Sequence, residues 1–193
     1  MAQLIRTLDA HQLQIHMNVT KHPLYDPKVT VWCAVWSRGV IGPNFFEDED
    51  GQAITVISQH YTEMINEFLA LKLPLNHNLW FQQNGAMAHM AVIGMAVLHC
   101  LFLQRMISRF GDVPWPPGSP DLTAPEFFLW GYLKSKVYSR RHVDLNALKH
   151  AIWDKTVSIS DGTLPEGCMQ LLNSCAPVHS GGWWPPKDIV HKE

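Results

Sequence analysis

The sequence has little charge and few cysteines, and each shortage excludes a class of protein. Only 17% of the 193 residues are charged, and the formal net charge is −2 with His neutral. This balance provides no global positive field for nucleic acid, so any contact with a phosphate backbone has to be local. The four cysteines form no CxxC pair and follow no signal peptide, which favours reduced thiols over a disulfide framework.

Metal-binding motifs and membrane spans are also lacking. Eleven His are present, but no HxH, HExxH or Cys/His framework groups them. The run EDEDG at 47–51 lacks the spaced ligands and distal Glu of an EF-hand loop and indicates a solvated turn. Residues 86–103 contain no Asp, Glu, Lys or Arg. Because His89 and His99 interrupt them without an aromatic and basic flank, a buried helix is favoured over a transmembrane span.

The hydrophobic content of 47% and the eight Trp indicate one folded domain. Strands are predicted where apolar residues alternate or cluster as β-branched runs, at 11–19, 29–36, 40–46, 79–83 and 105–110. Helices are predicted where the period is helical or begins after proline, at 58–73, 86–104, 126–138 and 144–155. Beyond residue 158 no period holds, and an irregular tail is expected.

The stretch FQQNGAMAH at 81–89 places an Asn-Gly pair between a strand and a run of helical length. A hairpin would need a second strand there, so the pattern predicts that Asn84 faces the mouth of a β-α turn, where α/β proteins place their chemistry. Glycine also leaves the backbone after Asn84 with little steric protection. Asn84 is therefore a candidate for slow deamidation to Asp or isoaspartate.

Four segments carry a family resemblance: VTVWCAVWSRGVIGPNFFEDEDG, LWFQQNGAMAH, ISRFGDVPWPPGSPDLTAPEFFLWGYLKSKVY and VDLNALK. From about Pro27 to about Ser160 the chain resembles the catalytic domain of the mariner-like transposases. The resemblance implies an α/β fold, with a ribonuclease H-like mixed β-sheet flanked by helices. It divides the chain into a divergent N-terminal segment (1–26), a transposase-like domain (27–157) and an irregular C-terminal tail (158–193).

The resemblance also implies an activity, which is metal-dependent DNA strand cleavage and transfer by a DDE endonuclease. Three acidic residues of such an enzyme hold two Mg²⁺ or Mn²⁺ ions, because closely spaced hard cations need oxygen ligands and compensating charge. DNA is the implied partner and the nucleus the implied location. A homo-oligomer is compatible with this family, whereas nothing points to a membrane or a small-molecule substrate.

Two of the family's acidic positions depart from the pattern. The second acid falls on Asn84, which offers a carbonyl oxygen but no charge, so metal binding is expected to be weak or lost. The third falls on Glu126, a candidate catalytic and metal ligand whose alternative role is charge compensation at a helix N-terminus.

The first acid has no counterpart in the resembling segments. Asp9 and Asp26 are the acids upstream, and neither lies in a stretch that resembles the family. The strand that carries the first acid is therefore expected to be missing, leaving unpaired edges in the sheet. The alternation over residues 11–19 suggests the hypothesis that this segment partly fills the gap.

Other residues have supporting roles by resemblance. Asp121 is expected to shape a turn before Thr123, and His89 is either a hydrogen-bonded residue of the first helical turn or a catalytic one. Candidate phosphate contacts form a basic cluster, with a solvated helix end as the alternative: Lys134, Lys136, Arg140 and Arg141. The pair Trp183-Trp184 could stack on bases, but no nearby basic residue supports this and an unselected tail is favoured.

Three functions remain open at this point. The first is a transposase-derived domain that is catalytically inactive. The second is a domesticated module that binds nucleic acid or protein without catalysis, and the third is a weak metal-dependent nuclease that uses Asn84, Glu126 and a substitute acid. The missing acids favour the first two over the third.

Overall fold

The computed structural model describes residues 3–7, 11–14, 28–74, 78–114 and 124–159, with only the backbone described at 11–14 and 124–128. Several predictions from the sequence fall outside these residues. They concern Asp9, Asp26, Asp121, Cys168, Cys175 and the tail from residue 160, including Trp183-Trp184.

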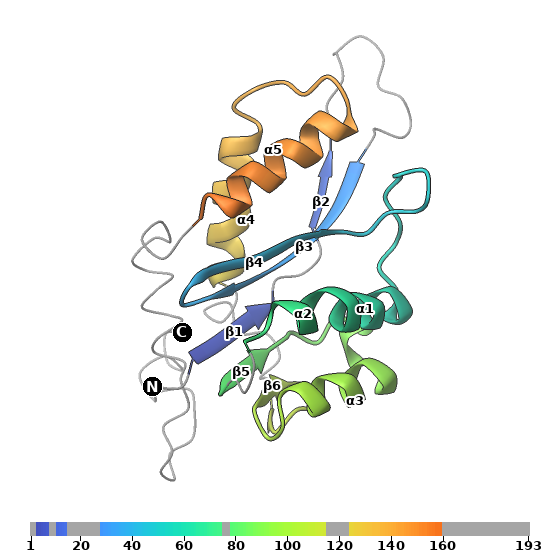
Figure 1. Ribbon diagram of the computed structural model, residues 1–193, viewed down its shortest axis with the longest axis vertical. Helices are drawn as coiled ribbons and strands as arrows, with labels where there is room; N and C mark the ends of the chain where they lie inside the picture. Colours follow the sequence, from blue (N-terminus) through green and yellow to red (C-terminus); the bar gives the residue numbers. More distant parts are fainter. Residues whose placement is uncertain (1–2, 8–10, 15–27, 75–77, 115–123, 160–193) are drawn as a thin grey trace, which may run out of the picture.

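A mixed β-sheet of seven strands forms the centre of the fold (Figure 1). The strands are β1 (Gln3–Thr7), β2 (His11–Gln14), β3 (Lys28–Trp36), β4 (Gly39–Phe45), β5 (Leu79–Gln82), β6 (Met106–Ser108) and β7 (Val113–Pro114). Their order is β2-β3-β1-β5-β6-β7, with β4 paired to β3. The pairs β1–β5, β5–β6 and β6–β7 are parallel. β3 pairs antiparallel with β1, β2 and β4. The predicted α/β fold with a mixed sheet is thus confirmed.

The expected loss of the first strand is wrong. β1 lies between β3 and β5, with Arg6 paired to Val35 on one side and to Gln82 on the other. Its Leu4 and Ile5 are only 1% and 0% exposed, so the strand is part of the core. Residues 3–7 lie upstream of the resembling segments and are too few to establish a period, which is why the sequence pattern did not reveal them.

The hypothesis for residues 11–19 is also wrong in its geometry. Of this segment, β2 pairs with β3 and not with β5, and His11 lies opposite Val31. β4 occupies one edge of the long strand β3. β1 and β2 therefore both pair with the opposite edge of β3, one after the other along its length. The segment 1–26 therefore contributes two strands to the same sheet as the rest of the chain.

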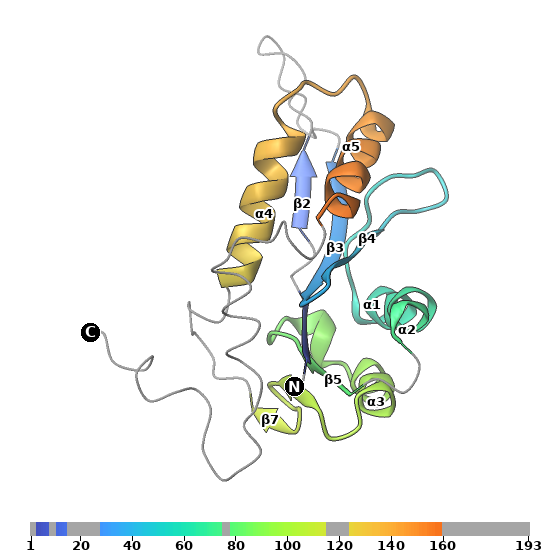
Figure 2. The same ribbon diagram turned by 60° about the vertical axis from the view of Figure 1, so that its left-hand side comes forward.

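Helices cover both faces of the sheet (Figure 2). They are α1 (Ser58–Met64), a π-helical turn (Ile65–Leu69), α2 (Ala70–Lys72), α3 (Val92–Leu101), α4 (Ala124–Val137) and α5 (Leu145–Val157). Side chains of α4 and α5 pack against Val29, Val31, Cys33 and Val35 of β3. Those of α1 and α3 pack with Ile5, Trp32, Leu79 and Phe81 on the opposite face.

The helix predicted over 86–104 is shorter and less buried than expected. It begins as a 3₁₀ turn (Met87–Met90), and α3 starts only at Val92. Val92 and Ile93 are 84% and 72% exposed, so the uncharged run is amphipathic in three dimensions rather than buried throughout. Among the described residues no helix is long and apolar enough to cross a membrane.

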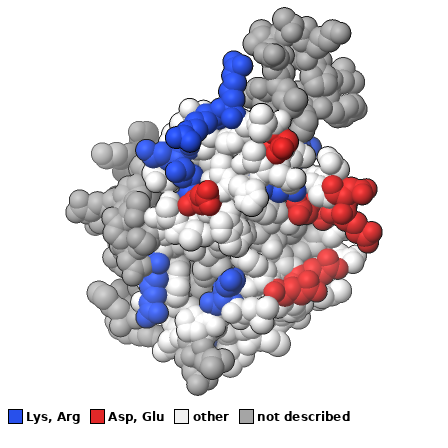
Figure 3. Space-filling view, turned by 45° about the horizontal axis from the view of Figure 1, so that its top comes forward, with Lys and Arg blue, Asp and Glu red and all other residues white. Residues whose placement is uncertain are grey.

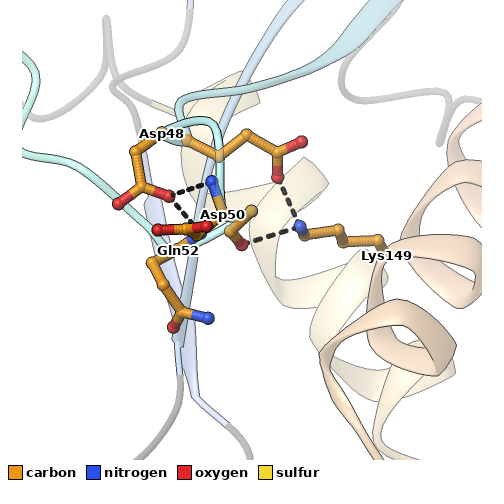
Figure 4. Close-up of polar contacts among 6 residues, drawn as sticks. Asp48, Asp50, Gln52 and Lys149 are labelled. Atoms are coloured by element: carbon orange, nitrogen blue, oxygen red, sulfur yellow. Dashed lines mark hydrogen bonds and ion pairs between the residues drawn. The ribbon is translucent and has the colours of Figure 1, made fainter.

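The acidic run at 47–51 forms a turn, as predicted (Figure 4). The Asp48 carboxylate accepts hydrogen bonds from the backbone N–H groups of Asp50 at 3.1 Å and Gln52 at 2.8 Å. Lys149 of α5 donates to the Gly51 carbonyl at 3.0 Å and forms an ion pair with Glu47. The contacts of Asp48 and Glu47 thus hold this loop in shape and against α5.

Candidate functional site at the carboxyl edge of the parallel strands

Three parallel strands end at the same edge of the sheet, and Asn84 lies there, two residues after β5. The Thr7 hydroxyl at the end of β1 donates to the Gln82 carbonyl at 2.9 Å, which ties the ends of β1 and β5 together. Carboxyl ends of parallel strands are where α/β sheets place ligands. The predicted position of Asn84 at the mouth of a β-α turn is confirmed.

The side-chain oxygen of Asn84 is occupied by two hydrogen bonds. It accepts from the backbone N–H of Ala86 at 3.0 Å and from Nδ1 of His89 at 2.9 Å. A backbone N–H can only donate, so the atom that faces Ala86 has to be the amide oxygen, and this settles the orientation of the amide. The NH₂ group of Asn84 consequently points away from both partners, where an aspartate would carry its second carboxylate oxygen.

His89 holds Asn84 from a buried position. Its side chain is 3% exposed, and its ring lies 4.2 Å from the ring of Tyr61 of α1, at 31°. Because the Asn84 oxygen only accepts, Nδ1 of His89 has to carry the proton. These contacts show that His89 is a hydrogen-bonded residue of the turn before α3, and its alternative catalytic role stays a prediction.

Gln83 connects His89 to helix α1. The Tyr61 hydroxyl donates to Oε1 of Gln83 at 2.8 Å, and Nε2 of Gln83 donates to the His89 carbonyl at 3.0 Å and to Sδ of Met95 at 3.2 Å. Buried polar side chains that satisfy one another in this way are rigid. The loop 83–89 is therefore a preorganised support for residue 84.

The described residues do not by themselves supply the ligands of a two-metal site, and Asp9 and the Glu126 side chain lie outside them. The Asn84 oxygen is taken up by Ala86 and His89, and the other terminal group of the amide is an NH₂ donor, which a cation cannot use as a ligand. Within the described parts of the chain, no three His, Cys, Asp or Glu residues are grouped so as to hold a metal ion. The oxygen-rich positions that two hard cations need are thus lacking among these residues.

Glu126 lies in the first turn of α4, as predicted, and its side chain is outside the described residues. The basic cluster lies further along: Lys136 is ten residues on, which at 1.5 Å per residue is roughly 15 Å along the axis. Lys136, Arg140 and Arg141 are exposed, and Nζ of Lys136 lies 5.7 Å from the Tyr132 ring. The structure places these cations at the far end of α4 and does not bring them to the same turn as Glu126.

Figure 3 brings the end of the molecule with the α4–α5 connection forward. Most of the Lys and Arg side chains on this face lie to the left and most of the Asp and Glu side chains to the right, with an acidic side chain also beside the basic ones on the left. This uneven distribution gives part of the face a local excess of positive side chains although the whole chain has a formal charge of only −2. A local positive surface of this kind is what a phosphate contact requires of a protein with no global basic field.

One residue of this edge was missed by sequence reasoning. Arg109 is exposed and follows β6 as Asn84 follows β5, because Gln82 pairs with Ile107 and each residue is two positions further on. A Cβ added at Gly85 would lie 3.9 Å from Cδ of Arg109. The sequence pattern hid this position because Arg109 falls inside the strand predicted over 105–110, whereas the observed β6 ends at Ser108. The equivalence of Arg109 and Asn84 is visible only once β5 and β6 are known to be parallel neighbours in this register.

Deamidation of Asn84 should be slower in the folded chain than in the unfolded one. The reaction needs the Gly85 backbone nitrogen to attack the Asn84 side-chain carbonyl, and two hydrogen bonds restrain that carbonyl. Peptide mapping after incubation of native and urea-unfolded protein measures the Asp and isoaspartate fractions at residue 84. Equal rates in the two samples would contradict the restraint.

Comparisons with known proteins bear on this arrangement through the fold. No family model and no curated protein sequence matches the chain. Solved structures do match. The catalytic domain of Mos1 mariner transposase is similar to it with a TM-score of 0.62 and 18% identity, over 88% of this chain and 77% of that one.

Two further structures of Mos1 transposase show the same similarity of fold. The Mos1 transposase catalytic domain with Raltegravir and Mn has a TM-score of 0.64, 17% identity, and coverage of 88% of this chain and 78% of that one. In the Mos1 transposase paired-end complex with left transposon end, the TM-score is 0.66 at 16% identity; 88% of this chain is covered, but only 52% of the transposase. The chain thus shares the ribonuclease H-like fold of that catalytic domain and spans about half of the longer protein.

Proposed function

We propose that this chain is a mariner-type, transposase-derived domain that retains contacts for DNA but does not cleave it efficiently. Its support comes from the family-like motifs of the sequence and from the fold shared with the Mos1 catalytic domain. The observation that carries the loss of cleavage is the Asn84 amide, whose oxygen is held by Ala86 and His89.

A transposase of this fold uses acidic side chains to hold divalent ions, which activate a water or a 3′ hydroxyl. In this chain the turn after β5 presents an NH₂ group where a carboxylate oxygen would stand, and removal of a charged ligand from a hard-cation site weakens it strongly. The hydrogen bonds among Tyr61, Gln83, His89 and Asn84 hold residue 84 in place, so a carboxylate introduced there would stand on a formed support. The remaining role for the domain is to bind and position DNA.

A second candidate function, a domesticated nucleic-acid-binding module, has the same physical basis. Exposed cations are present at the far end of α4 and in the turn after β6, among other places. Phosphate neutralisation by such cations is sequence-independent and weakens with salt. Both functions consist of binding DNA without cleaving it. They differ only in whether the cell uses that binding, as it would for a domesticated protein, or does not, as for an inactive transposase remnant.

Nicking of supercoiled plasmid in millimolar Mn²⁺, run beside fluorescence anisotropy with labelled duplex and forked DNA, tests this proposal. We expect no nicking above the rate without protein, and binding that persists in EDTA and falls as salt rises. Nicking by the unchanged chain that needs Mn²⁺ and disappears in Glu126→Gln would overturn the loss of cleavage. Absence of DNA binding at low salt would overturn the retained contact.

A further inference from the structure

We propose that Arg109 and Phe110 form a DNA-contacting pair beside Asn84, in which Arg109 binds a backbone phosphate and Phe110 stacks on a base of the same strand. This inference rests on the proposed function and specifies which atoms meet the DNA. It concerns a different place from the basic cluster, because it lies at the carboxyl edge of the parallel strands rather than at the far end of α4.

The position follows from the register of the sheet. β5 and β6 are parallel with Phe81 opposite Met106 and Gln82 opposite Ile107, so Arg109 continues β6 as Asn84 continues β5. The turn after β5 and the turn after β6 lie close together, because a Cβ added at Gly85 would be 3.9 Å from Cδ of Arg109. A strand of DNA laid across the Asn84 turn would therefore meet the Arg109 guanidinium.

The guanidinium of Arg109 is available for an anion. Its contacts are the Phe110 ring, with Cζ 5.4 Å from the centroid, and Sδ of Met90, 3.9 Å from Nη1. Asp112, the acid of the same turn, accepts a hydrogen bond from the Met106 backbone N–H at 2.9 Å and so faces the strand. Among the described residues, no carboxylate forms an ion pair with Arg109, which leaves its planar donors to a phosphate.

Phe110 completes the pair. Its side chain is 60% exposed, although a phenyl ring gains from leaving water. An exposed aromatic ring next to an arginine is the combination that single-stranded nucleic acid binds, with the base on the ring and the phosphate on the cation. Bases at a strand end or a fork are unstacked and can reach such a ring, whereas bases inside a duplex cannot.

The turn that carries the pair is held in one shape. A Cβ on Gly111 would lie 2.8 Å from the Met106 carbonyl oxygen and 3.0 Å from the Ser108 backbone nitrogen, so only glycine fits there without a backbone shift. The Gly111 N–H donates to the Ser108 carbonyl at 3.3 Å, and Asp112 closes the other side of the turn. Arg109 and Phe110 are thus presented on a preorganised loop, which lowers the entropy cost of binding.

Anisotropy titrations in EDTA, with a forked oligonucleotide and a fully paired one, test the pair independently of any metal. The variants are Arg109→Gln, Arg109→Lys and Phe110→Leu. The matched control is Arg38→Gln, because Arg38 is also exposed and also stacked on an aromatic ring, with Cζ 5.6 Å from the Trp36 centroid. It lies in the turn between β3 and β4, at the opposite end of the parallel strands.

We expect Arg109→Gln to weaken binding to both DNAs about tenfold and to lower the slope of log K against log salt by about 1. Arg109→Lys should retain the slope, and Phe110→Leu should weaken the forked DNA about tenfold while changing the duplex little. Binding by Arg109→Gln and Phe110→Leu that equals that of Arg38→Gln would overturn the pair but leave the proposed function standing. No binding by the unchanged chain would overturn both.

Discussion

Asn84→Asp should give a chain whose melting temperature rises in Mn²⁺, whereas that of the unchanged chain does not. One carboxylate oxygen can keep the hydrogen bonds from Ala86 and His89, and the other replaces the NH₂ group with an anionic ligand. A bound ion stabilises by RT ln(1 + [L]/Kd), about 1.4 kcal/mol at ten times Kd. For a chain of this size that is a rise of about 3–6 °C, which differential scanning fluorimetry resolves.

The matched control is Asn78→Asp. Asn78 is exposed and directly precedes β5, so the same change of charge is made at the opposite end of the same strand. A Mn²⁺-dependent rise of equal size in Asn78→Asp would mean that the ion binds to charge in general. A rise in the unchanged chain would show that a metal site survives with an amide at residue 84.

A second set of variants asks which acids assist residue 84. In the sequence, Asp9 comes two positions after the last residue of β1, as Asn84 comes two positions after the last residue of β5. Asp9→Asn and Glu126→Gln, each combined with Asn84→Asp, should each reduce the Mn²⁺-dependent rise if that acid contributes. If both double variants keep the full Mn²⁺-dependent rise in melting temperature, the ion binds to the introduced carboxylate at residue 84 without help from either acid. The site would then not be a two-metal site.

Ile5→Ala should cost about 2–5 kcal/mol of unfolding free energy, a large part of the roughly 5–15 kcal/mol typical of a domain. Ile5 is 0% exposed in β1 and packs in the cluster that contains Trp32, Phe81 and Leu98. Its truncation leaves a cavity on the side of the sheet that α1 and α3 cover. Urea unfolding followed by tryptophan fluorescence measures the loss.

Ile57→Ala is the control for this prediction. Ile57 precedes α1 and is 48% exposed, so the same truncation there should change stability by only about 0.5 kcal/mol. Similar midpoints for the two variants, with unchanged m-values, would mean that β1 does not belong to the folded core. The fold would then lack its strand between β3 and β5, as the sequence resemblance alone suggested.

Local elements were predictable because their signals are local. The pair β3 and β4 has a dense β-branched run followed by a turn, and the helix at 58–72 has a helical apolar period that ends before Pro74. The position of Asn84 at the end of a strand was predictable for the same reason, since the strand, the Asn-Gly pair and the following run are contiguous. Helix α4 begins with a proline among its first residues, as the sequence pattern indicates.

Long-range pairing was not predictable in the same way. β1 is five residues long, and its place between β3 and β5 depends on partners far away in the chain, as the pairs of Arg6 with Val35 and with Gln82 show. No period in such a short segment distinguishes a central strand from a loop. The burial of Leu4 and Ile5 exists only once both neighbours are present.

The sequence by itself determined the chemical identity of residue 84, an amide in place of an acid, and the strand-turn-helix order around it. Only the tertiary structure decided which way that amide points. Its oxygen is held by Ala86 and His89, and the loop is held by the hydrogen bond from Tyr61 of α1 to Gln83, 22 positions later in the chain. The tertiary structure also decided that Arg109 and Asn84 lie side by side, since parallel pairing brings together strand ends that are distant in the chain. Composition sets which groups are available, and packing sets which of their atoms face a ligand.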